Sequence, residues 1–478
     1  MTLRKRFFRI FIFSYLRGCM GKSNREILNI ALPSIAQNVT VPLLGLVDAA
    51  ISGHLGGAVY IGAVAVGSMV FNMIYWLCAF LRMSTGGLSA QAWGKAAGTD
   101  VKAKADRNGN MDILQVLFRA LKIGFVISML LIVLQKPLAD VSFWLMGATA
   151  EVERLSRIYF RILIWGAPAV IMSYGLSGWF LGRQDAKRPM AIAIVQNVIN
   201  IALSLFFVIF LGWKVEGVAT GTLIAQWAGV AMYLMCRVKK HESGEGAERL
   251  LQTICKNFRR MYTKESSMLS GKGVALEGAL FLRTLCMVSV QVAFTHAGAL
   301  QGDLVLAANA LLMQFYMFFS YFMDGFAYAG EAVGGKYVGA KDRKSFIAIT
   351  RGLFVWGVWL TVGFTIIYYF GGDTIVALLT NDVQVRTEAA LFMPYVLLLP
   401  VCGVAAFLFD GLYAGATKSM LMFLSVLAGA AVFFLILYIS SRSGDVSATN
   451  HCLWAAMLSF LAVRSVFLGV TYRKILPC

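Results

Sequence analysis

The amino-acid sequence predicts an all-α integral membrane protein with twelve transmembrane helices, and three observations support this fold class. Of the 478 residues, 59% are hydrophobic and only 14% are charged, whereas soluble domains carry about 25% charged residues. Apolar runs of about 20 residues, the length that crosses a bilayer, recur along the whole chain. These runs show no two-residue alternation, so helices rather than a barrel satisfy the backbone polar groups inside the bilayer.

The predicted spans are separated by short loops, with one exception after the sixth. They cover residues 26–50, 58–92, 112–135, 155–178, 189–212, 217–236, 276–298, 304–334, 346–371, 387–414, 419–441 and 450–472. The second and eighth spans are long enough either to continue beyond the bilayer or to tilt strongly within it.

Lys and Arg concentrate in alternate loops: before span one and after spans two, four, six and eight. Loops on the other side, such as 301–303 and 371–373, carry no basic residue. Because basic residues favour the cytoplasmic side, we expect both termini to be cytoplasmic in a multi-pass protein of a cell membrane, the bacterial inner membrane. This alternation also explains the net charge of +19, so we expect no nucleic-acid partner.

The N-terminal arm and the cysteines give two further expectations. No short apolar stretch with a cleavage site follows the basic arm at 1–25, so no cleaved signal peptide is expected. The eight cysteines are scattered without a CxxC pair, which is typical of packing residues rather than of a disulfide or metal framework.

The soluble insert at 237–272 has an apolar stripe at helical spacing. The stripe consists of Leu250, Leu251, Ile254, Phe258 and Met261. It predicts either an interfacial helix on the anionic inner leaflet or a flexible connector with a helical patch.

The two halves of the chain repeat each other. The segment 87–98 matches 327–339 when Gln91 is aligned with Glu331, and 178–185 matches 411–418. Six spans per half is an even number, so we expect two parallel six-helix lobes with a central cleft for the substrate. The predicted domains are a basic arm (1–25), an N-lobe (26–236), a linker (237–272) and a C-lobe (273–478). Glycine-rich helix ends that recur for packing alone are the alternative.

Carboxyl groups inside spans are costly and mark functional sites by default. The four candidates that stand out are Asp48 in span one, Asp324 and Glu331 in span eight, and Asp410 in span ten. Gln37 lies on nearly the same helical face as Asp48, and Tyr328 lies between the two acids of span eight. A carboxyl group in an apolar cleft can change protonation as the cleft opens to either side, which a proton-coupled antiporter requires. A structural carboxylate bonded to neighbouring helices is the alternative.

Polar stripes also occur on spans five and six. They consist of Asn197, Asn200 and Ser204 on span five and of Thr222 and Gln226 on span six. Such groups either hold a carboxylic acid and line a wet cavity or pack through interhelical hydrogen bonds. The sequence does not assign partners to the span arginines Arg82, Arg161 and Arg283.

Several segments resemble the multidrug and toxic compound extrusion (MATE) family, and its DinF-like branch in particular, over nearly the whole chain. The segments are 31–34, 42–55, 80–91, 178–185, 307–310, 324–332 and 409–417. The resemblance implies a transporter, not an enzyme, with a two-lobe fold that exports organic cations or related toxic compounds in exchange for protons or sodium. It implies that Asp48 is the coupling acid, with Asn200 and Ser204 as partner groups.

Relatives in this branch commonly carry an acid where Ser204 stands. A single titrating Asp48 is then the simpler expectation, and sodium binding is weakened because hard cations favour carboxylate oxygens. We therefore expect multidrug or toxin efflux by alternating access, driven by protons rather than sodium. We expect small cationic or amphipathic substrates, no cofactor and a monomer.

Two other functions compete with this one. A lipid-linked precursor flippase of the same broad superfamily requires a strongly cationic cavity, and the span interiors offer few arginines. An intramembrane protease would use the GxSG segment at 175–178 with His296, but Ser177 and His296 lie near opposite helix ends, so no hydrogen bond between them is expected.

Overall fold

The computed structural model describes residues 21–53, 57–97, 102–147, 149–238, 271–443 and 446–477. Within these ranges, twelve helical stretches are long and apolar enough to cross a membrane, which confirms the predicted all-α fold class. The apolar stripe of the linker 237–272, for which an interfacial helix and a flexible connector are the two interpretations, and most of the basic arm 1–25 lie outside the described residues.

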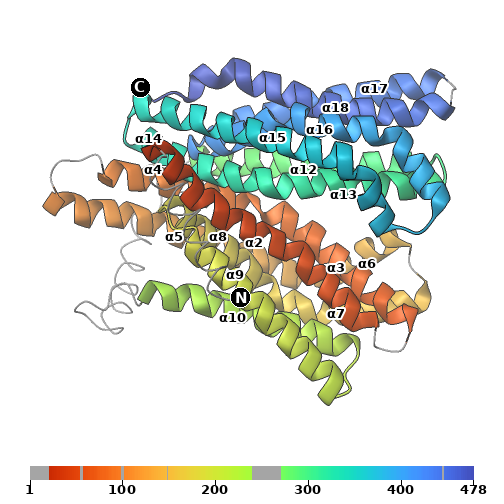
Figure 1. Ribbon diagram of the computed structural model, residues 1–478. Coiled ribbons are helices and arrows are strands. Elements are labelled where there is room, and N and C mark those ends of the chain that lie inside the picture. Colours follow the sequence, from red (N-terminus) through yellow and green to blue (C-terminus); the bar gives the residue numbers. More distant parts are fainter. Residues whose placement is uncertain are drawn as a thin grey trace, which may run out of the picture.

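The first half of the chain forms the helices coloured red to light green in Figure 1. They are α2 (Lys22–Gly53), α3 (Ala58–Cys78), α4 (Phe80–Ala97), α5 (Lys102–Val133), α6 (Gln135–Met146), α7 (Ala150–Leu163), α8 (Ala167–Gly182), α9 (Lys187–Leu205) and α10 (Val215–Val238). Span two consists of α3 and α4, and span four of α7 and α8. The short helix α6 was not predicted, because at twelve residues it is shorter than a span.

The second half forms the helices coloured green to blue. They are α12 (Gly271–Ala299), α13 (Asp303–Ala329), α14 (Gly335–Gly339), α15 (Arg343–Leu379), α16 (Val383–Gly415), α17 (Ser419–Ser443) and α18 (Val446–Thr471). A π-helical turn, η4 (Gly330–Gly334), joins α13 to α14. Wide turns of this kind are frequent at functional sites.

Several helices are longer than their predicted spans. The predicted span 155–178 belongs to the stretch Ala150–Gly182, and the predicted span 346–371 to the stretch Arg343–Leu379. The added turns carry charged residues such as Glu151, Glu153 and Lys344. An apolar-run criterion stops at such residues, whereas a helix continues as long as its backbone hydrogen bonds do.

The two halves lie on opposite sides of the molecule, and α4 and α14 meet at one end (Figure 1). Glycines allow this contact: a Cβ atom on Gly94 would overlap the carbonyl oxygen of Lys336, and one on Gly339 would overlap that of Gln91. Both glycines belong to the repeated segment found in the sequence. The repeated glycines therefore do serve packing, and the packing is between the halves.

The second repeated segment has the same backbone in both halves. Gln184 and Thr417 hold equivalent places two residues after Gly182 and Gly415, and both have a positive φ, at 65° and 55°. This conformation is uncommon for residues other than glycine. Gln184 donates to the carbonyl oxygen of Ala332, and Thr417 accepts from Gln91, so each turn contacts the opposite half.

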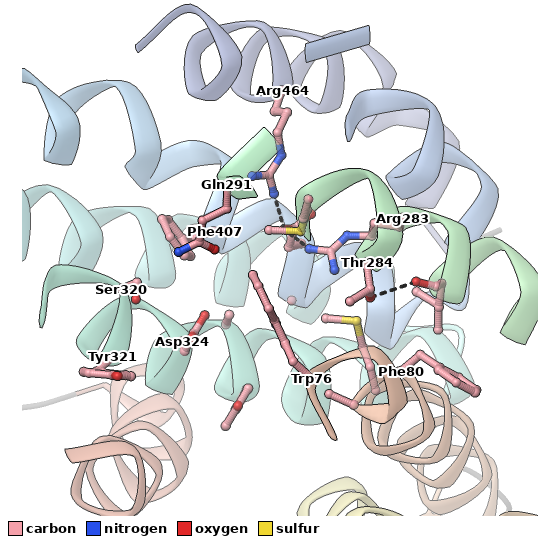
Figure 2. A pocket seen from close by; sticks show the side chains of 18 of the residues that line it. Trp76, Phe80, Arg283, Thr284, Gln291, Ser320, Tyr321, Asp324, Phe407 and Arg464 are labelled. Carbon is pink, nitrogen blue, oxygen red and sulfur yellow. Dashed lines mark hydrogen bonds and ion pairs between the residues drawn. The ribbon is translucent and has the colours of Figure 1, made fainter. Parts of the chain in front are cut away.

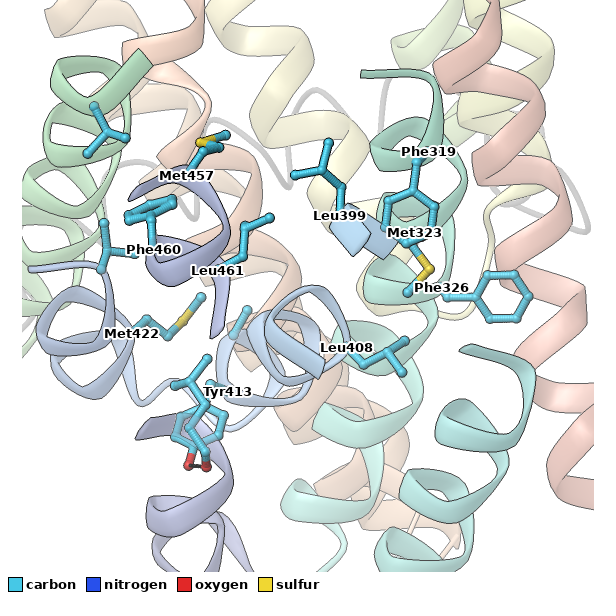
Figure 3. Packing of buried hydrophobic residues seen from close by; sticks show 14 of the residues in the cluster. Phe319, Met323, Phe326, Leu399, Leu408, Tyr413, Met422, Met457, Phe460 and Leu461 are labelled. Carbon is cyan, nitrogen blue, oxygen red and sulfur yellow. Dashed lines mark hydrogen bonds between the residues drawn. The ribbon is translucent and has the colours of Figure 1, made fainter. Parts of the chain in front are cut away.

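Each half has its own apolar core. Two clusters of buried residues fall within the first half, while a third consists mainly of residues from the second. Figure 3 shows part of this third cluster, where Phe319 of α13, Leu408 of α16 and Leu461 of α18 are buried. These cores fix the helices of each half and leave polar side chains to line the space between them.

Candidate functional site

A cavity of about 350 Å³ lies between the halves (Figure 2). Helices α2, α3 and α4 of the first half and α12, α13, α16 and α18 of the second contribute side chains to its wall. Much of this wall is aromatic. The aromatic residues are Trp76, Phe80, Tyr316, Tyr321, Tyr328, Phe407 and Phe460.

Two arginines meet one carboxylate in this wall. Arg283 of α12 and Arg464 of α18 each donate a hydrogen bond to Oδ2 of Asp410 on α16, at 2.5 and 2.6 Å. All three side chains are buried, and Arg464 is only 2% exposed. The Oδ1 atom of Asp410 and the Nε atoms of both arginines are buried without a partner. The cluster therefore carries one positive charge in excess and unused donors.

A second ion pair crosses between the halves. Arg82 of α4 donates to Oε2 of Glu331 in η4 at 3.3 Å, and its guanidinium group lies 3.9 Å from the centroid of the Tyr328 ring. Glu331 is 1% exposed, and its Oε1 atom is buried without a partner. All three residues belong to the cavity wall, where Arg82 is the more exposed member of the pair.

Asp324 of α13 also lines the cavity and forms no ion pair with any residue that the structure describes. The charged residues of the cavity wall are thus three arginines (Arg82, Arg283 and Arg464) and three acids (Asp324, Glu331 and Asp410). The expectation of few arginines in the span interiors is wrong for this cavity. Arg464 was overlooked, although an arginine within an apolar span is itself a signal.

Asp48 lies in a different cluster, inside the first half. Its Oδ1 atom is buried without a hydrogen bond, and its carboxyl group interacts electrostatically with Tyr159 of α7. The Tyr159 hydroxyl lies 3.2 Å from Ser68 Oγ and also interacts with Thr222 of α10. Among the described residues, the carboxyl group thus interacts with a tyrosine that belongs to a network of hydroxyl groups, and it forms no ion pair.

The polar stripe of α9 extends this network. Asn200 donates from Nδ2 to Oγ1 of Thr222 at 2.9 Å, and its Oδ1 atom is buried without a partner. Ser204 is fully buried, and its hydroxyl also lacks a partner. Asn200 and Thr222 thus link Asp48, through Tyr159, to the contact between α9 and α10.

The other predicted residues lie outside both clusters. Asn197 donates to the backbone of Thr40 at 3.3 Å and joins α9 to α2. Gln226 is buried, with Oε1 unpartnered against Gly166. Gln37 is half-buried, and its neighbour Asn38 lines the cavity instead. The residues predicted for a single cleft are thus divided between the Asp48 cluster, the cavity and interhelical packing positions.

The serine and histidine of the protease alternative are far from a catalytic arrangement. Ser177 lies in α8 and interacts with Tyr233 of α10, in the first half. His296 lies in the last turn of α12, in the second half. Neither residue contributes to the cavity wall.

Comparisons with known proteins cover nearly the whole chain. The family model described as MatE matches residues 33–206 and 279–439. The chain is 34% identical over 469 residues to DNA damage-inducible protein F of Escherichia coli (strain K12), covering 98% of this chain and 96% of that protein. It is 21% identical over 373 residues to the probable multidrug resistance protein NorM of Thermotoga maritima, covering 76% and 73%.

The fold is also found among solved structures. The Vibrio cholerae MATE transporter VcmN in its bent form has a TM-score of 0.76 with 17% sequence identity, covering 95% of this chain and 97% of that one. At this identity the likeness concerns the fold, and it includes both halves of the chain.

Proposed function

Because the chain belongs to the multidrug and toxic compound extrusion (MATE) family of membrane transporters, we propose that it exports small organic compounds by alternating access in exchange for protons. Members of this family are transporters, not enzymes, which excludes the intramembrane protease. The substrates that we propose are cationic or amphipathic compounds of a size that fits the cavity between the halves.

The observation that carries the proton-coupling proposal is the unpaired carboxyl group of Asp48. A buried acid with a cationic partner stays ionised, whereas one without such a partner gains or loses its proton as water reaches it. The Oδ1 atom of Asp48 is buried without a hydrogen bond, and its carboxyl group interacts with Tyr159, whose hydroxyl in turn contacts Ser68 and Thr222. Such a group can carry a proton from one side of the membrane to the other.

Protons fit this cluster better than sodium does. A hard cation favours several oxygen ligands, with carboxylates among them. Ser204 stands where a second carboxylate would lie on α9, so within the described part of this cluster only Asp48 supplies negative charge. The remaining oxygens, such as Asn200 Oδ1, are neutral.

We propose that the halves 26–236 and 273–478 are the lobes that move, connected by the linker 237–272, in a monomer of a bacterial inner membrane. Alternate loop charges support cytoplasmic termini. The end at which α4 meets α14 is then cytoplasmic. Its close glycine contacts support a state that is closed toward the cytoplasm.

A flippase for lipid-linked precursors is the second candidate. The arginines of the cavity wall favour it, because a diphosphate headgroup requires cationic partners. Against it, three acids balance the three arginines, so the wall as a whole is not strongly cationic.

The test uses purified protein in phospholipid vesicles, with a pH gradient or a sodium gradient imposed separately. Ethidium serves as an organic cation and dansylglycine as an organic anion. We expect the pH gradient to drive transport of at least one probe, and Asp48→Asn to reduce that transport at least tenfold. Asp303→Asn, which changes an exposed acid of α13, is the matched control. If Asp48→Asn leaves pH-driven export intact, Asp48 is not the coupling residue.

A further inference from the structure

The cluster of Arg283, Asp410 and Arg464 has a charge imbalance that packing does not explain. Two buried guanidinium groups share a single carboxylate, and both donate to the same oxygen atom, Oδ2. A carboxylate can accept one guanidinium in a bidentate pair and be neutralised by it. Among the ion pairs of the described residues, the second arginine therefore has no carboxylate of its own, and a buried cation in this arrangement is costly and marks a functional site.

The donors of this cluster are incompletely used. A guanidinium group carries five N–H donors, yet the Nε atoms of Arg283 and Arg464 are buried without a partner. Figure 2 shows the two guanidinium groups converging from different helices into the cavity that Trp76 and Asp324 also face. A ligand anion placed there would meet donors from two directions and restore charge balance.

The surroundings favour an apolar body attached to that anion. Trp76, Tyr316 and Phe407 line the same cavity, and the rings of Tyr316 and Phe407 lie 6.3 Å apart. Phe460 is part of this wall, and its ring centroid lies 5.1 Å from Cζ of Arg464. The cavity volume of about 350 Å³ lies within the usual range of small-molecule sites.

We propose that Arg283 and Arg464 bind the anionic group of an amphipathic substrate, a carboxylate, sulfonate or phosphate, while its apolar body lies between Trp76, Tyr316 and Phe407. Asp410 holds the two guanidinium groups together when the site is empty. On an anion's arrival the cluster has two positive and two negative charges. A basic group on the same compound, where present, faces Asp324. This inference rests on the proposed export function and narrows its substrate class.

The test measures binding at equilibrium, without any gradient. Purified protein in nanodiscs of phosphatidylcholine is titrated with dansylglycine and with its uncharged amide, and dansyl emission is followed on excitation of tryptophan, because Trp76 lines the cavity. We expect the acid to bind at least tenfold more tightly than the amide. Equal affinities would overturn the proposal, and this comparison requires no variant.

Two variants separate charge recognition from a structural role. Arg464→Gln leaves one arginine with one acid, so the ratio of the two affinities should fall to near one. Arg464→Gln combined with Asp410→Asn leaves Arg283 as an unpaired cation, so the preference for the acid should return. If the double variant stays as unselective as the single one, the excess charge does not select the ligand. Arg154→Gln, at an exposed position of α7, is the matched control and should keep the preference.

Two sources of the anion can be separated in the same assay. Undecaprenyl phosphate and the neutral polyprenol are added to the nanodiscs in competition with dansylglycine. Displacement by the phosphate alone supports the site and indicates a lipid-linked anion. With the preference for the acid established, no displacement by either lipid supports a free amphipathic compound. Binding requires no gradient, so the two proposals can fail separately. Absence of pH-driven export together with an intact preference for the acid over the amide would contradict the proposed function and support this inference.

Discussion

Arg82 and Glu331 form a 3.3 Å ion pair that joins the two halves of the molecule at the wall of the cavity. Arg82 comes from α4, five residues before the repeated segment of the first half, and Glu331 from the π-helical turn η4 within the repeated segment of the second. A molecule in the cavity would lie next to Arg82 and Tyr328, and Arg82 holds the buried Glu331. Occupancy of the cavity and closure of the end at which α4 meets α14 are therefore physically connected.

Glu331→Gln should favour opening of the end at which α4 meets α14. The change leaves the largely buried Arg82 with a weaker partner, and a charged hydrogen bond contributes about 1.5–3 kcal/mol. A loss of that size changes the ratio of two conformations about tenfold or more. Spin labels at the exposed positions Lys95 and Arg343, on the two halves, would report longer distances by pulsed electron resonance.

The matched control is Glu151→Gln, at an exposed acid of α7, which should leave the distance distribution unchanged. Reversing the pair with Arg82→Glu and Glu331→Arg should shift the distribution back toward the closed state. An unchanged distribution in Glu331→Gln would show that the ion pair does not hold the halves together.

Gly94→Ala should disturb the same end through steric overlap. A Cβ atom on Gly94 would overlap the carbonyl oxygen of Lys336, which is backbone and has no rotamer to adopt. We expect slower transport and a lower melting temperature, although alanine favours a helix over glycine by about 1 kcal/mol. Gly363→Ala is the control, because nothing lies within 4 Å of its added methyl group. If both variants have the same transport rate and melting temperature, the close approach of α4 and α14 is not required for transport or stability.

The sequence predicted the twelve spans because span formation depends on local composition. It also predicted that Glu331 and Gln91 hold equivalent positions, and both do make contacts between the halves: Glu331 with Arg82, and Gln91 with the backbone of Gly415. Such positions can be predicted from local patterns because the spacing of residues along a helix determines which side chains share a face.

The pairing of charges could not be predicted in the same way. Asp410 and Arg283 were both noted in the sequence, but they lie on different spans, and nothing local brings them together. Arg464 completes the cluster from the last span. Which of the predicted polar residues join the Asp48 cluster and which line the cavity likewise depends on how the helices pack, because each span presents several polar faces to its neighbours.

Asp342→Ala should lower the stability of the protein in a pH-dependent way. Asp342 is the N-cap of α15, and its carboxylate accepts from the backbone N–H of Ser345 at 3.0 Å. The hydrogen bonds from Ser345 hold the pKa of Asp342 below its usual value of 3.8. A lowered pKa means that this contribution is complete above the unfolded-state pKa and is lost as the pH falls through the folded-state pKa.

An N-cap of this kind contributes about 1 kcal/mol, and solvent screens the purely ionic part at this partly exposed site. Thermal unfolding of the purified protein at pH 7 should therefore show a lower melting temperature for Asp342→Ala, and the difference should shrink near pH 3. Asp342→Asn keeps the cap but has no titrating group, so its difference from the wild type should not follow this trend. An equal decrease in melting temperature at both pH values would indicate that the carboxylate does not cap α15.

Ser204→Asp should change how transport depends on ions. Ser204 is fully buried on α9, four residues after Asn200, and its hydroxyl lacks a partner, so an acid there would add a second carboxylate to the network around Asp48. Two carboxylates repel when both are ionised and attract a hard cation more strongly than one does. We expect sodium to stimulate transport and the pH profile to shift in Ser204→Asp, while Ser204→Ala keeps the wild-type behaviour. Flux in vesicles with separate sodium and proton gradients measures both effects, and a profile identical to the wild type in both respects would remove this position from the coupling mechanism.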